Sequence, residues 1–130
     1  MTSWIRNLTA VMLVCGWLLS PSLARADPDI AGTWLGKLSV GEVSLRVAFN
    51  LKHDAKGAWS GTLDSPDQNA YGIAIDTVKL EGTTLKITIA MIQGSFEGQW
   101  QASPEQIIGT WTQVGRDLPL TLTRSAPLAH

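Results

Sequence analysis

The sequence predicts an all-β protein, and three observations lead to this expectation. From residue 31 onward, apolar and polar residues alternate with a period of two, as in strands with one buried and one solvated face. Short clusters of glycine and polar residues interrupt the alternation, as in hairpin turns. These connections are too short for crossover helices, so consecutive strands are expected to pair in antiparallel fashion.

On these criteria we predict eight strands. The alternation is clearest in residues 43–52, where valine, leucine and phenylalanine occupy the odd positions. The predicted strands are residues 32–40, 43–52, 57–64, 71–80, 84–92, 95–101, 106–112 and 117–124. A meander of this kind has two unprotected edges, and closure into a barrel removes both. We therefore expect an eight-stranded antiparallel up-and-down barrel, with a β-sandwich as the alternative because it obeys the same alternation.

Two details of the pattern bear on the interior. In the fourth predicted strand, Ile73 and Ile75 share a face with Leu80 only after a slip of one residue, which indicates a β-bulge near Asp76–Thr77. Glycines recur on the inward face, where each one removes side-chain volume. They are Gly36, Gly61, Gly98 and Gly109. Space left beside these glycines would form a ligand-sized cavity.

Residues 1–26 have the features of a secretory signal peptide. A basic residue precedes the uncharged, mostly apolar run Leu8–Leu19, and small residues stand at Ala24 and Ala26. The run is shorter than the roughly 20 apolar residues that a membrane-spanning helix needs. We therefore expect cleavage after Ala26 and a single β-barrel domain at 27–130, which is periplasmic or secreted and not inserted in the membrane.

Composition disfavours several functional classes. The 10 lysines and arginines do not outnumber the 11 aspartates and glutamates, whereas nucleic-acid-binding proteins usually have a basic excess. The single cysteine, Cys15, lies in the predicted signal peptide. A zinc site would need several cysteine or histidine ligands, and the only histidines are His53, in a predicted turn, and His130, at the end of the chain. We expect no metal, no cofactor and no nucleic-acid partner.

The two ends of the predicted barrel contain a recognisable pair of motifs. Ile30–Trp34 reads IAGTW and Leu120–Arg124 reads LTLTR, and both resemble the first and last strands of calycins, the lipocalin and avidin grouping. In that grouping the tryptophan of the first strand packs beneath a basic residue of the last. The resemblance therefore implies that Trp34 and Arg124 close the barrel. The strand parity agrees, because Arg124 shares its face with Leu120 and Leu122.

A second resemblance covers nearly the whole predicted mature chain. The strings GTWLGKL, LDSPDQ (Leu63–Gln68) and GSFEGQW resemble a small β domain that precedes secreted bacterial α/β-hydrolase domains. This resemblance implies a non-catalytic accessory or interaction module, in a free-standing version because the chain ends at His130, with a secreted hydrolase or other envelope protein as partner. The chain lacks the G-x-S-x-G nucleophile motif, so hydrolase activity is not expected.

An alternative function is that of a carrier for a small apolar ligand. An eight-stranded barrel is just wide enough to be filled by its side chains or to hold one small ligand. Trp59, Phe96 and Trp100 are the aromatic residues expected to line such a cavity.

One polar loop also stands out. It gathers Asp64, Ser65, Asp67 and Gln68 beside the end of a predicted strand. Such a loop either faces a ligand or is a turn whose side chains cap its own backbone. Its carboxylates are too few for a calcium loop. An enzyme, the least favoured alternative, would have to use Asp64, Asp67 or His53.

Overall fold

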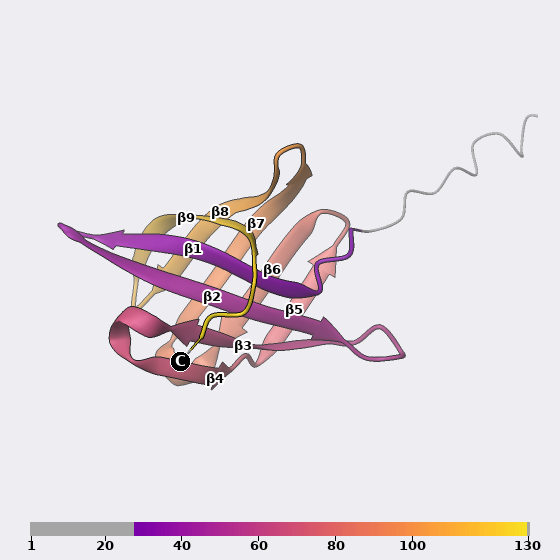
Figure 1. Cartoon of the computed structure of the whole chain (residues 1–130), viewed down its shortest axis with the longest axis horizontal. Helices are drawn as coiled ribbons and strands as arrows, with labels where there is room; N and C mark the ends of the chain where they lie inside the picture. Colours follow the sequence, from indigo (N-terminus) through magenta and orange to yellow (C-terminus); the bar gives the residue numbers. More distant parts are fainter. Residues whose placement is uncertain (1–27, 130) are drawn as a thin grey trace, which may run out of the picture.

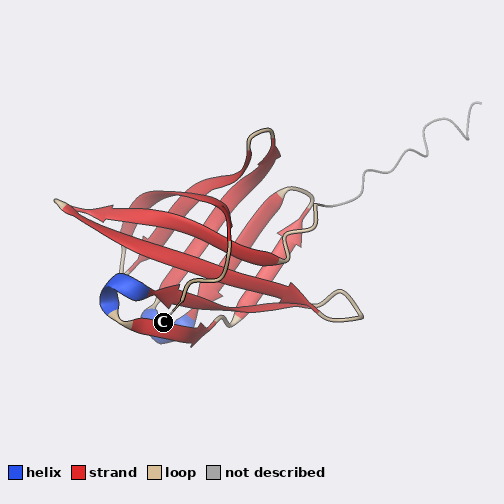
Figure 2. Ribbon diagram, viewed as in Figure 1, coloured by secondary structure: helices blue, strands red, loops and turns tan. Residues whose placement is uncertain are grey.

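The computed structural model describes residues 28–129, which form a strongly curled antiparallel sheet with the shape of a half-barrel (Figure 1). Within these residues the sheet has nine strands, and two short 3-10 helices, η2 and η3, lie in its connections (Figure 2). The strands are β1 (Gly32–Val40), β2 (Val43–His53), β3 (Trp59–Ser65), β4 (Ala70–Ala74), β5 (Thr77–Glu81), β6 (Thr84–Ile89), β7 (Gly94–Ala102), β8 (Glu105–Gln113) and β9 (Arg116–Ser125).

The helix η2 (Pro66–Gln68) follows β3, and η3 (Ala90–Ile92) follows β6. No helix in the described part of the chain is long and apolar enough to cross a membrane. The signal peptide predicted at residues 1–26 lies outside the described residues.

The first and last strands are neighbours in the middle of the sheet. The strand order is β4-β3-β2-β1-β9-β8-β7-β6-β5, so the two edges are β4 and β5. The β1–β9 ladder is short, with Trp34 directly opposite Arg124 and Leu35 opposite Thr123. The ends of the meander are therefore joined, as the closure motif predicted, while the sheet is open at another place.

The prediction of eight strands is wrong, because the fourth predicted strand is two strands with different partners. β4 pairs with β3, whereas β5 pairs with β6. The change occurs between adjacent residues: the Ile75 amide donates to the Gly61 carbonyl (3.1 Å), and the Asp76 amide donates to the Thr88 carbonyl (2.9 Å). The parity slip that predicted a bulge near Asp76–Thr77 thus coincides with a change of neighbour, which opens the expected barrel.

The predicted strand at 84–92 is also too long. β6 ends at Ile89, and the chain then turns through η3. The residue after this helix, Gln93, has a left-handed backbone (φ 52°). The Asp76 carboxylate accepts a hydrogen bond from the Ala90 amide at the start of this turn. The sheet is therefore shortened at this end.

The core lies in the concavity of the curled sheet. Phe49 on β2 packs against Phe96 on β7 and Trp111 on β8, with ring centroids 5.8 and 6.2 Å apart. The strands on the two sides of the half-barrel therefore face each other through apolar side chains. The largest fully buried residues are Ile30, Trp34, Phe49, Leu85, Ile87, Ile89, Phe96, Ile107, Leu120 and Leu122.

Candidate functional site

The space beside the inward glycines is occupied by neighbouring groups. A Cβ at Gly98 would lie 2.6 Å from the Phe96 ring, and one at Gly36 would lie 2.6 Å from Leu120. At Gly61 and Gly109 the obstacle is backbone, with carbonyl oxygens 2.3 and 2.1 Å away. The glycines therefore allow close packing, because a neighbouring side chain or carbonyl oxygen occupies the position that a Cβ would take at each of them.

The three aromatic residues predicted to line a cavity have separate environments. Phe96 is 1% exposed and belongs to the core. Trp59 is partly buried and meets the His53 ring edge-on, with centroids 4.8 Å apart. Trp100 is also partly buried, and its indole Nε1 donates to Glu105 (3.0 Å). Each ring thus has a partner within the protein.

The polar loop after β3 is held by its own hydrogen bonds. Asp64 is 7% exposed, and its carboxylate accepts from the Asn50 side chain (3.0 Å) and from the Gly72 amide (2.7 Å). The Ser65 hydroxyl donates to the Gln68 side-chain oxygen (2.8 Å). These contacts give Asp64 and Ser65 a structural role in fixing η2 to the sheet.

Asp67, in the middle of η2, is bound to β2. Its carboxylate forms an ion pair with the Arg46 guanidinium (2.9 Å) and also accepts from the Arg46 backbone amide (2.8 Å). These interactions hold the pKa of the Asp67 carboxyl below its usual value. In residues 28–129, no group of three or more acidic, histidine or cysteine side chains is arranged to hold a metal ion.

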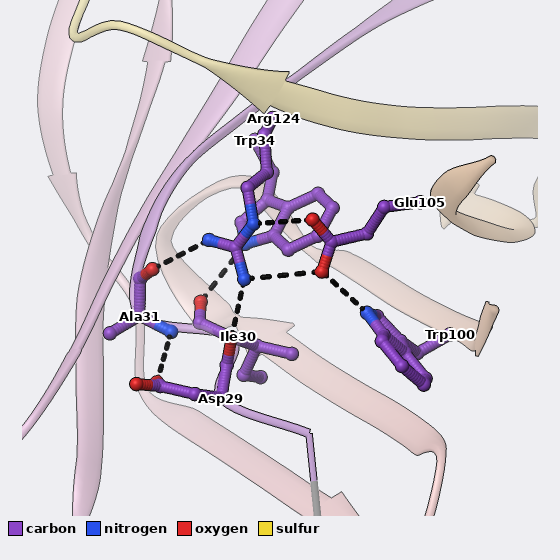
Figure 3. Close-up of polar contacts among 7 residues, drawn as sticks. All are labelled: Asp29, Ile30, Ala31, Trp34, Trp100, Glu105 and Arg124. Atoms are coloured by element: carbon purple, nitrogen blue, oxygen red, sulfur yellow. Dashed lines mark hydrogen bonds and ion pairs between the residues drawn. The ribbon is translucent and has the colours of Figure 1, made fainter. Parts of the chain in front are cut away.

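The predicted contact between Arg124 and Trp34 is present, and Figure 3 shows that it is part of a larger cluster. The guanidinium carbon lies 4.5 Å from the centroid of the buried Trp34 ring. The same group donates to the carbonyls of Asp29 and Ala31, the latter at 2.8 Å, and thereby holds the segment before β1. The Trp34 indole completes the contact by donating to the Ile30 carbonyl (2.9 Å).

Glu105, at the start of β8, is the anionic partner that sequence analysis missed. It accepts from Arg124 Nε (2.7 Å) through one carboxylate oxygen and from the Trp100 indole (3.0 Å) through the other (Figure 3). The Arg124 and Trp100 hydrogen bonds hold the pKa of Glu105 below its usual value. We call Trp34, Trp100, Glu105 and Arg124 the clasp.

The opposite end of the half-barrel is built differently. Here η3 is joined to the end of β8: the Gln113 side chain donates to the Ile92 carbonyl (2.9 Å), and the Val114 amide donates to the Gln93 carbonyl. Gln68 of η2 and Val40 at the end of β1 lie beside the same β8–β9 turn. We call this region the η end. It exposes apolar side chains, because Val43 is 56%, Met91 77% and Val114 74% exposed.

The η end contains a hollow of about 430 Å³. Its apolar walls are Val40, Leu45, Leu118 and Val114, and its polar lining is Gln68, Gln113 and Arg116. Of the loop residues that sequence analysis proposed for ligand binding, only Gln68 lines this hollow. Sequence analysis missed the remaining residues that line the hollow, because no local motif marks them. The valine before Gly115 in a tight turn was the one available signal.

Comparison of the chain with known protein families, curated protein sequences and solved structures found no match.

Proposed function

We propose that this protein is a periplasmic or secreted, non-catalytic interaction module, which binds a partner protein through its surface. The observation that carries this proposal is the close packing at the inward glycines, where sequence analysis expected a cavity. Phe96, Leu120 and backbone carbonyls occupy the space beside the inward glycines, whereas a carrier needs that space for its ligand. Such packing favours binding at the surface over binding in a cavity beside these glycines.

Two parts of this proposal, the export of the protein and its relation to a known type of β domain, rest on the sequence. The features of residues 1–26 support export, and the LDSPDQ string supports a relation to the β domains that accompany α/β-hydrolases. The contact of Trp34 with Arg124 supports a calycin-like closure of the sheet. A secreted hydrolase is accordingly the partner that we expect.

The distribution of polar groups supports a non-catalytic role. The carboxylates of Asp64 and Asp67 accept hydrogen bonds from other groups of the protein, and the Glu105 carboxylate is bound to Arg124 within the clasp. His53 lies beside Asp29, with 3.6 Å between Nε2 and the carboxylate, at the surface of the protein. The side chains of Asp64, Asp67 and Glu105 therefore already have partners within the protein.

Native mass spectrometry separates this proposal from the carrier alternative. The protein is isolated under mild conditions from the envelope or secreted fraction of the cells that produce it. We expect a complex with a second protein and no stoichiometric small-molecule adduct. A persistent adduct of small mass on the monomer would overturn the proposal in favour of a carrier, and its mass would indicate the class of ligand.

A further inference from the structure

Val114 occupies a turn position that disfavours valine in two ways. Val114 and Gly115 connect β8 to β9, and both have positive φ angles, 48° and 74°. Such two-residue hairpin turns favour Asn-Gly, because a β-branched side chain is strained in the left-handed region. The side chain is also 74% exposed, so it gains little from burial within this chain. Strained residues of this kind concentrate at functional sites.

The hollow beside Val114 has a definite chemical character. Val40, Leu45 and Leu118 supply apolar walls at the mouth of the concavity. The Arg116 side chain has no hydrogen bond or ion pair with another described residue, in contrast to Arg46 and Arg124. The Gln68 side chain uses its oxygen to accept from Ser65, and its amide N–H groups have no hydrogen-bond partner among the described residues.

We propose that the η end is a docking site for a protein segment that carries an apolar side chain next to a carboxylate. The apolar side chain enters the hollow against Leu45 and Leu118, and the carboxylate binds the Arg116 guanidinium with help from the Gln68 amide. This inference rests on the proposed function, because it specifies the chemistry of the partner.

The surroundings of the hollow favour a polypeptide over a free small molecule. Small-ligand sites usually enclose most of the ligand surface, whereas this hollow opens at the end of the sheet. Val43, at the start of β2, and Met91, in η3, expose apolar surface at the same end, which a small carboxylate does not reach and a protein partner covers. The strained Val114 then gains its contacts from the partner.

The first test uses a minimal probe, N-acetyl-leucyl-leucine, titrated into isotope-labelled protein and followed by amide NMR shifts. We expect saturable shifts at Leu45, Val114 and Arg116. The matched C-terminal amide of the same dipeptide should bind about threefold to tenfold more weakly, as expected for loss of one partly exposed charge pair. Absence of saturable shifts at the hollow, or equal affinities of acid and amide, would overturn the proposed chemistry.

Variants extend the test to the natural partner. Arg116→Gln should remove the preference for the acid over the amide, whereas the control Lys56→Gln, an exposed charge in the turn after β2, should keep it. Val114→Asn should weaken binding of both probes while raising Tm, because asparagine suits the turn. Weaker binding in a more stable protein excludes misfolding as the cause.

Recovery of the partner complex, measured with the same three variants, distinguishes the two proposals. Loss of the complex with Val114→Asn and Arg116→Gln, but not with Lys56→Gln, supports the docking site. If a complex forms equally well with all three variants, the docking site is wrong and the interaction module stands. If the dipeptide binds as described while the isolated protein carries only a small-molecule adduct, the interaction module is wrong.

Discussion

β9 carries an arginine near each of its ends, and the two side chains have opposite environments. Arg124, in the clasp, stacks on Trp34 and donates to Glu105 and to the carbonyls of Asp29 and Ala31. Arg116, at the η end, lines an open hollow and has no side-chain partner in the described part of the chain. Both residues share the inward parity of the strand, so the sequence pattern alone does not separate them.

This difference separates groups that stabilise the fold from groups that are free to bind. A guanidinium has five N–H donors. Those of Arg124 bond to Glu105 and to the carbonyls of Asp29 and Ala31. In the clasp, Arg124 joins the segment before β1 to β8 and β9. At the η end, the chain forms two short helices in place of further strand, and Arg116 has no side-chain partner among the described residues.

The largest expected effect comes from removing the centre of the clasp. Trp34→Ala deletes a fully buried ring that also supports Arg124, so we expect a loss of about 3–5 kcal/mol in the free energy of unfolding. Chemical denaturation measures it. Trp34→Phe keeps an aromatic ring but removes the hydrogen bond to the Ile30 carbonyl, and its loss should be smaller. An unchanged unfolding midpoint in Trp34→Ala would show that the clasp does not hold the sheet together.

A matched pair of substitutions on β9 tests the comparison directly. Arg124→Leu removes the ion pair with Glu105 and the bonds to the segment before β1, so we expect a loss of about 2 kcal/mol. Arg116→Leu removes no side-chain partner among residues 28–129, so the free energy of unfolding should change by less than about 0.5 kcal/mol. Thermal and denaturant unfolding of both variants measure these changes. Equal losses of unfolding free energy would mean that the clasp and the η end do not differ as described.

Local pattern predicted most of the fold, and it failed where the answer depended on distant partners. The bounds of β1, Gly32–Val40, coincide with the prediction, because regular alternation there ends at a glycine turn. The break between β4 and β5 was misread as a bulge. The Ile75 and Asp76 amides bond to strands on opposite sides of the opening, whereas the local sequence shows only a slip in parity, which fits a bulge as well as a change of neighbour.

The same distinction applies to the functional residues. Parity and motif predicted that Trp34 meets Arg124, but Glu105 was missed because its role depends on how β8 lies beside β9. The polar loop was noticed for its composition, and the structure uses Asp64 and Asp67 internally. Composition identifies polar groups, whereas only the fold shows which of them have partners.

The smallest expected effect concerns the clasp in acid. Arg124 and Trp100 lower the pKa of Glu105, so its carboxylate contributes stability above the unfolded-state pKa of about 4.3, and this contribution is lost as pH falls through the lower folded-state pKa. Because the side chain is 34% exposed, the contribution should be below about 1 kcal/mol. Glu105→Gln should therefore lose less stability than the unmodified protein when Tm is measured from pH 7 to pH 3. Asp54 and Asp67, whose pKa values are also lowered, contribute equally to both proteins, so the difference between the two Tm curves isolates Glu105. Parallel curves would show that the ionised state of Glu105 is not what the clasp stabilises.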